Sequence, residues 1–173
     1  MNIVSEKMHL RALEEKDCDM LLRIINDPDT ERMLGGSSFP VSSVAQKDWL
    51  INKASGKNIL RCAIVPADNN DVAVGTAMLT DIDEKNATAE IHIKLDLEVR
   101  HEGYGTQAIN LLVKYAFEQL RLNCLYAKIL EANIPSQKLF EKCGFSKEGV
   151  LRSRLYKDGE YKDLLIYSIL KND

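Results

Sequence analysis

The sequence is poor in the residues that mark several specialised classes of protein. Cysteine occurs only at Cys18, Cys62, Cys124 and Cys143, with no C-x-x-C pair and no histidine at a metal-ligand spacing. This pattern does not indicate a disulfide framework, and it predicts no metal site. We therefore expect the four thiols to be small core residues of a protein in a reducing compartment.

Long apolar runs and a strong excess of one charge are also absent. No stretch approaches the roughly 20 apolar residues of a membrane-spanning helix. The opening MNIVSEKMHL lacks the basic and then apolar order of a signal peptide. A formal net charge of −3 provides no basic field that would gather nucleic acid. The sequence therefore predicts a cytoplasmic protein that binds neither nucleic acid nor membranes.

The chain does contain enough apolar residues for one core. Its 173 residues are 45% hydrophobic and 28% charged. No linker, repeat or low-complexity tract divides them. We expect residues 1–173 to form a single domain.

The order of strand and helix patterns predicts an α+β fold. Strand patterns cover residues 3–13, 59–67, 72–82, 88–97 and 123–132, and a last hairpin has Asp158-Gly159 at its tip. Helix patterns start at a capping Asp17, at Ser43 with Gln46 in a capping box, at Thr106 and at Pro135. We expect a central mixed, mostly antiparallel sheet of about seven strands flanked by four helices.

Two glycines stand in front of the longest amphipathic helix pattern, in VRHEGYGTQAINLLVKYAF, residues 99–117. A helix N-terminus has unpaired N–H groups and the positive end of the helix dipole, and glycine lets the backbone approach an anion closely. Gly103 and Gly105 thus stand where a pyrophosphate could be held. On the glycines alone, a tight turn from strand to helix explains the pattern equally well.

Other phosphate-binding motifs fit less well. The G-x-x-x-x-G-K-[ST] loop is absent. Residues 103–108 do satisfy the G-x-G-x-x-A pattern of dinucleotide-binding folds, and Glu131 ends the next strand pattern. That motif belongs in a parallel βαβ unit, whereas the preceding strand pattern alternates charged and apolar residues and follows an antiparallel meander. A nucleotide-dependent dehydrogenase is therefore the weaker alternative.

One strand pattern, TAEIHIKLDLE, carries ionisable residues along one whole face. With a period of two, Glu90, His92, Lys94, Asp96 and Glu98 point one way and the apolar residues point the other way. Because burying unpaired charge is costly, this face meets either bulk solvent or a wet cleft. If it lines a cleft, Glu90 is placed to act as a base.

The segment RHEGYG, residues 100–105, resembles the R/Q-x-x-G-x-G/A signature of the GNAT superfamily of acetyl-CoA-dependent N-acetyltransferases. Residues 10–34 resemble the first strand and helix of the branch that holds the ribosomal-protein N-terminal acetyltransferases and the polyamine acetyltransferases. Residues 133–170 contain N-x-x-S, G-F-x-x-E-G and D-G in the order and spacing of that branch. The resemblance covers nearly the whole chain and implies the GNAT fold.

The resemblance implies acetyl-CoA as the cofactor, with CoA as its product, and no metal. The positions that it implies for cofactor binding are Leu95, Leu97, Arg100, His101, Glu102, Gly103, Tyr104, Gly105, Thr106 and Asn133. The two leucines are expected to offer backbone groups to the thioester end and the pantetheine arm. The loop from Arg100 through Thr106 is expected to hold the phosphates, and Asn133 to contact the arm.

The resemblance also implies the catalytic positions, with Glu90 as the base and Ser136 as the acid. Ser136 matches a serine that protonates the leaving thiolate in the ribosomal-protein branch, although a serine in a first helical turn is also a common cap. Two positions depart from the family. Phe140 stands where many relatives have a proton-donating tyrosine, and Leu155 stands where a glutamate assists the base.

The expected activity is transfer of acetyl from acetyl-CoA to a primary amine by direct attack in a ternary complex. The acceptor is left open between a protein N-terminus, a polyamine of the spermidine type, an amino sugar and an antibiotic. An α-amino group, with a pKa near ~8, loses its proton more readily than a lysine-like amine with a pKa near ~10.4, so a weaker base is sufficient for it. The departures at Phe140 and Leu155 keep a non-catalytic acyl-CoA-binding module as a further alternative. The oligomeric state, a homodimer included, is also left open.

Overall fold

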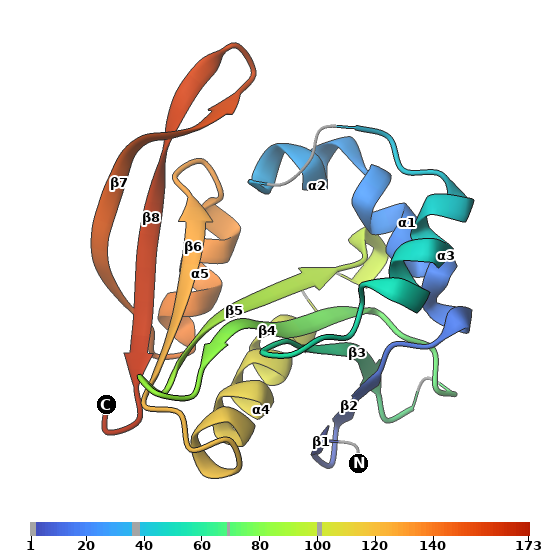
Figure 1. Ribbon diagram of the computed structural model, residues 1–173, viewed down its shortest axis with the longest axis horizontal. Helices are drawn as coiled ribbons and strands as arrows, with labels where there is room; N and C mark the ends of the chain where they lie inside the picture. Colours follow the sequence, from blue (N-terminus) through green and yellow to red (C-terminus); the bar gives the residue numbers. More distant parts are fainter. Residues whose placement is uncertain (1–2, 36–38, 69, 100–101) are drawn as a thin grey trace.

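The computed structural model describes residues 3–35, 39–68, 70–99 and 102–173, and its named strands form one eight-stranded sheet. The strands are β1 (Ile3–Val4), β2 (Met8–Ala12), β3 (Leu60–Pro66), β4 (Gly75–Asp83), β5 (Thr88–Leu95), β6 (Cys124–Leu130), β7 (Ser146–Lys157) and β8 (Glu160–Leu170). Their order is β1-β2-β3-β4-β5-β6-β8-β7, and the pairing is antiparallel except between β5 and β6. In Figure 1 the β6–β8 part of the sheet turns away from the β1–β5 part.

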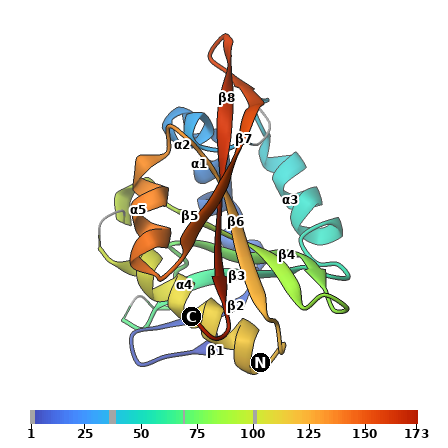
Figure 2. The ribbon, with the colours of Figure 1, turned by 90° about the vertical axis from the view of Figure 1, so that its left-hand side faces the viewer.

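Helices cover both sides of this sheet. They are α1 (Cys18–Asn26), α2 (Pro28–Met33), α3 (Ser43–Asn52), α4 (Tyr104–Glu118) and α5 (Ile134–Lys142), with 3₁₀ turns at Glu15–Asp17 and Leu97–Val99. Figure 1 shows α1 to α3 on one side of β3 to β5 and α4 on the other side. Figure 2, viewed across β7 and β8, shows α3 and α5 on opposite sides of this part of the sheet.

The α+β class and the antiparallel meander of β3, β4 and β5 are confirmed, and the strand count is one higher than predicted. The first strand pattern is broken where the backbone N–H of Ser5 donates to the carbonyl of Met8 at 2.8 Å. This turn folds β1 back onto β2, with Ile3 opposite Leu10. Period-two alternation alone did not reveal a turn this tight.

The structure also has one more α-helix than predicted, because a short helix begins at Pro28 directly after the end of α1. Pro28 follows the end of α1 at Asn26, and it begins α2. Asp27 caps this new helix, since its Oδ2 accepts a hydrogen bond from the N–H of Thr30 at 2.6 Å. Proline is favoured in a first helical turn, where its missing N–H has no cost. The Asn-Asp-Pro sequence was therefore a helix start as well as a helix end.

Asp17 does not cap α1 with its side chain. Its buried carboxylate accepts two hydrogen bonds from the guanidinium of Arg11, at 2.8 and 2.9 Å, and one from the N–H of Glu14 at 2.8 Å. Asp71 also accepts from Arg11 Nε at 2.7 Å and pairs with Lys16. We call Arg11, Lys16, Asp17 and Asp71 the Arg11 cluster. It ties β2 to the start of α1.

The cap of α3 is shifted by one residue from the prediction. Ser42 is the cap, and its hydroxyl accepts from the N–H of Ala45 at 3.1 Å. Ser43 is instead the first helical residue. Gln46, predicted to complete a capping box, is turned inward and is only 6% exposed. Two adjacent serines offered the same capping chemistry, and the backbone geometry selected the first.

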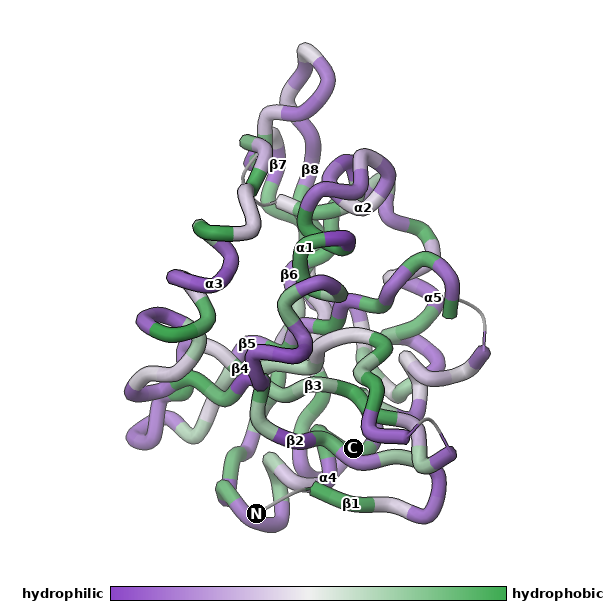
Figure 3. The backbone as a smooth tube through the Cα atoms, turned by 90° about the vertical axis from the view of Figure 1, so that its right-hand side faces the viewer, coloured by the Kyte–Doolittle hydropathy of each residue, from purple (hydrophilic) through white to green (hydrophobic). Residues whose placement is uncertain are grey.

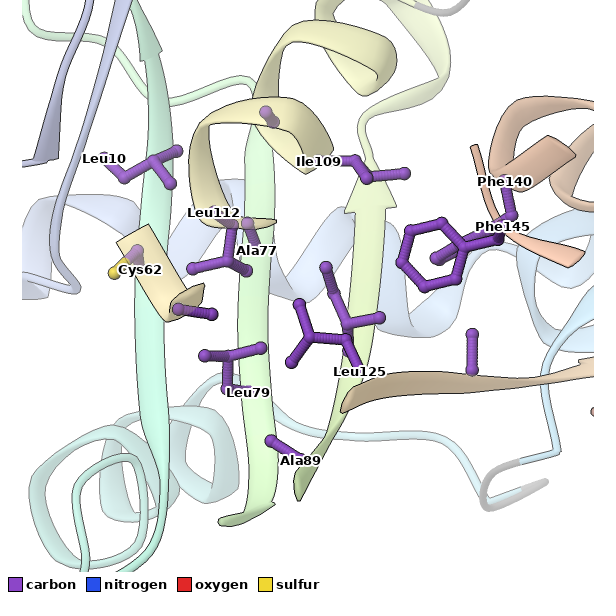
Figure 4. Close-up of a cluster of buried hydrophobic side chains, with 14 of the residues drawn as sticks. Leu10, Cys62, Ala77, Leu79, Ala89, Ile109, Leu112, Leu125, Phe140 and Phe145 are labelled. Atoms are coloured by element: carbon purple, nitrogen blue, oxygen red, sulfur yellow. The ribbon is translucent and has the colours of Figure 1, made fainter. Parts of the chain in front are cut away.

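The main core lies between α4 and the sheet. Ala108, Ile109, Leu112 and Ala116 of the predicted inward face are fully buried, and Figure 4 shows Ile109 and Leu112 beside Leu10, Ala77, Leu79 and Leu125. Burial of each large apolar side chain contributes about 1.5–3 kcal/mol. Cys62 belongs to this core, and burial raises the pKa of its thiol to about 11. Cys18 is buried as well, whereas Cys124 and Cys143 are half-buried.

The β7–β8 hairpin closes the fold beside α2. Asp158 and Gly159 have φ of 51° and 86° at its tip, which confirms the predicted turn, and its outer end is mostly hydrophilic (Figure 3). The ammonium of Lys157 pairs with the carboxylate of Glu31 and donates to its backbone carbonyl at 3.0 Å. This contact joins the hairpin to α2 at the border of the site described next.

Candidate functional site

Strands β5 and β6 separate part of the way along their length. They pair only where Thr88–Glu90 faces Cys124–Tyr126. Beyond Glu90, β5 continues to pair with β4 as far as Leu95 opposite Gly75. Within the described part of the chain, one edge of β5 therefore has no strand partner after Glu90, and Figure 1 shows β6 diverging from it.

A cavity of about 400 Å³ lies where the two strands separate. Side chains from α1, α2, β5, β6, α5, β7 and β8 line it, and we call it the splay cavity. Glu90 and Ser136, the two predicted catalytic residues, both line it, as do Asn133, Phe140 and Leu155. Residues far apart in the sequence thus meet around one space.

Glu90 is only 6% exposed and has two charged or polar neighbours. The ammonium of Lys128 donates a hydrogen bond to Oε2 at 2.7 Å, and this bond raises the pKa of Lys128. The Nε2 atom of His92 lies 3.7 Å from Oε1. Sequence reasoning missed Lys128, because its position opposite Glu90 depends on the register of the parallel β5–β6 pair.

His92 is less peripheral than a solvent-facing strand histidine. Burial lowers the pKa of its imidazole below the ordinary value, with opposing contributions from Glu90 and nearby lysines. The ring is therefore neutral near pH 7. Its Nε2 lies 2.9 Å from Thr80 Oγ1. A neutral imidazole beside a buried carboxylate can accept a proton.

Asn133, not Ser136, is the cap of α5. The Oδ1 of Asn133 accepts from the N–H of Ser136 at 3.1 Å, and its Nδ2 donates to the carbonyl of Met33 at 3.0 Å. Among the residues that the structure describes, the hydroxyl of Ser136 has no hydrogen-bond partner. The capping explanation of Ser136 is therefore wrong, and its hydroxyl is available to the cavity.

The N-terminus of α4 differs from those of α2, α3 and α5, which have side-chain caps. Gly103 stands at the cap position with a φ of 83°, and no side chain caps the first turn. A Cβ on Gly103 would meet only Gln107 Nε2, at 3.8 Å. Among the described residues, the space beside Gly103 is thus open, and a helix N-terminus without a side-chain cap has N–H groups that can bind an anion.

Gly105 is more closely packed by its neighbours than Gly103 is. A Cβ there would come within 3.2 Å of Leu139 and 3.4 Å of Leu95, so this glycine also serves helix packing. Tyr104 and Thr106 are half-buried beside it, and Glu102 is exposed. The predicted positions Arg100 and His101 lie outside the described residues.

The prediction that Leu97 lies on the extended strand is wrong. β5 ends at Leu95, and Leu97 begins a 3₁₀ turn with its side chain 44% exposed. The chain turns there, because the N–H of Val99 bonds to the carbonyl of Asp96 at 3.3 Å and the Asp96 carboxylate pairs with Arg23 at 2.6 Å. Leu95 keeps the predicted position on the free edge.

A second cavity, of about 600 Å³, lies between α1, α3 and the β4–β5 strands. We call it the α1–α3 cavity. It shares Ile25, His92 and Lys94 with the splay cavity, so the two spaces meet over β5. Arg61 also lines it, with its guanidinium 5.2 Å from the centre of the Trp49 ring. The ionisable face predicted on β5 is therefore a cleft wall at His92 and Lys94.

Within the described ranges, no helix is long and apolar enough to cross a membrane. No group of three or more His, Cys, Asp or Glu side chains in the same ranges could hold a metal ion.

Comparison with solved structures places the fold among N-acetyltransferases. A crystal structure of spermidine N-acetyltransferase from Vibrio cholerae, in complex with CoA and spermine, superposes with a TM-score of 0.87 at 24% sequence identity. The alignment covers 97% of this chain and 98% of that chain. At this identity the likeness establishes the fold.

Sequence comparison gives the family. The chain is 30% identical over 172 residues to the uncharacterized N-acetyltransferase p20 of Bacillus licheniformis, covering 99% of this chain and 97% of that protein. It is 29% identical over 171 residues to the spermidine N(1)-acetyltransferase of Vibrio cholerae serotype O1, covering 98% and 96%. These relatives displace the dehydrogenase alternative. With residues 7–146 matching the model described as an acetyltransferase (GNAT) domain, the chain belongs to the GNAT acetyltransferase family.

Proposed function

We propose that this protein transfers an acetyl group from acetyl-CoA to a primary amine by direct attack in a ternary complex. The observation that carries the proposal is the meeting of Glu90 and Ser136 in the splay cavity, where β5 and β6 separate. Glu90 provides a carboxylate for the amine side of the reaction. Ser136 provides a hydroxyl for the side on which the thiolate leaves.

The open edge of β5 and the uncapped start of α4 fit acetyl-CoA, which when bound supplies the acetyl group as an activated thioester. Backbone groups of β5 beyond Glu90, Leu95 among them, would hold the extended pantetheine arm. The N–H groups of Tyr104, Gly105 and Thr106 would hold the pyrophosphate. Asn133 contributes by fixing the start of α5, since both of its polar side-chain atoms already bond within the protein.

Glu90 acts on the amine proton together with His92. A carboxylate that is hydrogen-bonded to the Lys128 ammonium is a weak base, whereas a neutral imidazole is a stronger base at the same pH. With its proton on Nε2, toward Thr80 and Glu90, the His92 ring has a lone pair on Nδ1 for the amine proton. Glu90 then stabilises the imidazolium that forms.

Ser136 is the proton donor for the leaving sulfur. Phe140, at the position of the family tyrosine, packs edge-on against Phe145 with ring centres 4.9 Å apart and has no proton to give. Leu155 likewise brings no acid to the cavity. A thiol has a pKa near ~8.5, so a single weak donor is sufficient for a group that already leaves well.

Two acceptor classes remain to be compared. The α-amine of a peptide suits a base whose pKa lies below the ordinary histidine value, because an amine with a pKa near ~8 is about one-tenth neutral at pH 7, a handicap of only about 1.4 kcal/mol. A polyamine is suggested by the name of the 29% identical relative, a spermidine N(1)-acetyltransferase. Its amines, with a pKa near ~10.4, have a handicap of roughly 4 kcal/mol near pH 7. The lowered pKa of His92 therefore favours an α-amine as the acceptor.

The test is CoA release from acetyl-CoA with a panel of peptides, spermidine and amino sugars. We expect turnover with at least one amine, and losses of about tenfold or more for Glu90→Gln and Ser136→Ala. Lys47→Gln, which removes an exposed charge on α3 that pairs with Glu15, is the control. Binding of acetyl-CoA without turnover of any amine would contradict the proposal and identify a non-catalytic acyl-CoA-binding module.

A further inference from the structure

The α1–α3 cavity has more positive than negative charge on its walls. Lys53, Arg61 and Lys94 line it, and the single carboxylate among its described lining residues is that of Asp48. This carboxylate accepts a hydrogen bond from the side-chain amide of Asn52 at 2.8 Å, on the same helix. A cavity with this balance favours an anionic group in its occupant.

Neither half-buried cation of this cavity, Lys94 or Arg61, is neutralised by a carboxylate of the described residues. Lys94 is half-buried and has no hydrogen-bond or ion-pair partner among them. Burial lowers the pKa of its ammonium, and the nearby Arg61 lowers it further. Arg61 Nη1 donates to the carbonyls of Lys53 and Ala54, both at 2.9 Å, which leaves other N–H donors of the guanidinium.

Gln46 adds an uncharged polar group to the wall of the same cavity. Its side chain is only 6% exposed and lines the same cavity, yet its amide has no hydrogen-bond partner among the described residues. Because no fully buried side-chain N or O atom of the described residues lacks a hydrogen-bond partner, the amide atoms of Gln46 must be accessible from the cavity, where they can bond to an occupant. An amide and two cations around one space can together bind a carboxylate.

The position of the cavity relates its occupant to the reaction. His92 and Lys94 belong to both cavities, and Lys94 stands four residues beyond Glu90 on β5. At about 3.3 Å per residue, the two Cα atoms are roughly 13 Å apart. An extended peptide covers that distance in about four residues or fewer when long side chains reach inward. The amine and the anion of the acceptor are thus separated by a short stretch of chain.

We propose that the acceptor is a peptide or protein N-terminus with an acidic side chain among its first few residues, whose carboxylate is bound by Lys94, Arg61 and Gln46. The apolar side chains of Leu21, Ile24 and Trp49 pack against the peptide between its two charged ends. This inference rests on the proposed function and specifies its substrate. A polycation is disfavoured in the same cavity, because its second amine would face Lys94 and Arg61.

The experiment compares peptides that begin Ser-Glu-Glu, Ser-Gln-Gln and Ser-Lys-Lys and are otherwise identical, with spermidine and glucosamine 6-phosphate as further acceptors. We expect kcat/KM for the Glu peptide to exceed that for the Lys peptide by about tenfold or more, since a charge-assisted bond contributes about 1.5–3 kcal/mol. We also expect the difference to shrink at high salt. Equal values, or preference for spermidine or for the sugar phosphate, would overturn the inference.

Substitutions of the cavity residues test whether the α1–α3 cavity causes the preference for the Glu peptide. Lys94→Gln should raise KM for the Glu peptide by about tenfold while leaving kcat/KM for the Gln peptide nearly unchanged. Arg61→Gln and Gln46→Leu should act in the same direction. Lys47→Gln removes one positive charge from the same helix region outside the cavity and should keep the preference. An undiminished preference in Lys94→Gln and Arg61→Gln would contradict the assignment.

Failure of this inference is distinguishable from failure of the proposed function. If some other amine is acetylated and the Glu peptide is not preferred, the inference is wrong and the proposed function stands. If no acceptor is acetylated, both are wrong. Binding of the N-terminally acetylated Glu peptide, measured by calorimetry, is a readout without turnover. We expect it to weaken in Lys94→Gln, and equal binding by both proteins would contradict the inference.

Discussion

Two clusters of ionisable side chains lie on the same sheet and differ in how completely their charges are paired. In the Arg11 cluster, Asp17 and Asp71 both bond to Arg11, and the bonds from Lys16 and Arg11 hold the pKa of Asp71 well below its usual value. On β5, Glu90 is paired with Lys128, whereas Lys94 has no partner among the described residues.

The two clusters therefore differ in role. The Arg11 cluster is structural, whereas on the proposed function the ionisable residues of β5 take part in binding and catalysis. The Arg11 cluster has cations and anions in mutual contact, so it holds β2, α1 and the loop of Asp71 together without any ligand. The β5 row borders two cavities and is neutralised only in part. An incompletely paired charge beside a cavity is costly for the empty protein and favourable for one that contains the complementary ligand.

The largest effect is expected for the base. His92→Gln should lower kcat/KM by about 100-fold or more, as expected for loss of a general base. Because burial lowers the pKa of His92, the wild-type rate should stay level as pH falls toward ~6.5 and should decline only below that value. The variant should lack this acidic decline. A pH–rate series on both proteins checks this, and parallel profiles would show that His92 is not the proton acceptor.

The next largest effect is on folding, at the Arg11 cluster. Asp17→Asn should lower the free energy of unfolding by about 3 kcal/mol, because it removes one partner of a buried pair and leaves Arg11 with an uncompensated charge. Urea denaturation followed by circular dichroism measures this. Glu15→Gln, at an exposed pair with Lys47, is the control and should leave the midpoint unchanged. A reduced kcat in folded Asp17→Asn would contradict the structural role of the cluster.

A smaller effect is expected for the acid. Ser136→Ala should lower kcat at saturating substrate by about tenfold and should leave stability nearly unchanged, since Asn133 is the cap of α5. Asn133→Ala provides the contrast, with a loss of about 1 kcal/mol in unfolding free energy. Steady-state kinetics and thermal unfolding separate the two. A Ser136→Ala protein with unchanged kcat would rule out Ser136 as the proton donor.

The smallest effect is expected at Lys94, where a substitution compares directly how much the two clusters contribute to stability. Lys94→Met should change the free energy of unfolding by less than about 1 kcal/mol, because Lys94 has no described partner to lose and its burial disfavours the charge. Arg11→Met, with the same change from a cation to an apolar side chain, should be strongly destabilising. Parallel urea titrations measure both. Equal losses would show that Lys94 is held by pairing after all.

Much of the site followed from the sequence, because it rests on local patterns. The period of two placed Glu90, His92 and Lys94 on one face, and the glycine pattern marked the start of α4. Ser136 came from the family resemblance. Lys128 and Gln46 could not be found in this way. Lys128 depends on the register between β5 and β6, and Gln46 depends on the rotation of α3 once Ser42 had become its cap.

The fold follows the same rule. The meander and the last hairpin were predicted because alternation and turn residues act over a few positions. The division of the first strand at Ser5 and the short helix α2 were missed, because a tight turn and a single helical turn and a half leave little periodicity to detect. Leu97 was misplaced because the chain turns after β5, where the N–H of Val99 bonds to the carbonyl of Asp96 and the Asp96 carboxylate pairs with Arg23.

The unpartnered edge of β5 has a consequence for how long the protein lasts. An exposed strand edge is a place where a second chain can add itself, which is the first step of aggregation. A cofactor arm that pairs with this edge would occupy the place of a missing strand and stabilise the folded chain by mass action. On the proposed function, a shortage of acetyl-CoA would then reduce the amount of intact enzyme as well as its rate. Supply of the metabolite would govern the lifetime of the protein that consumes it.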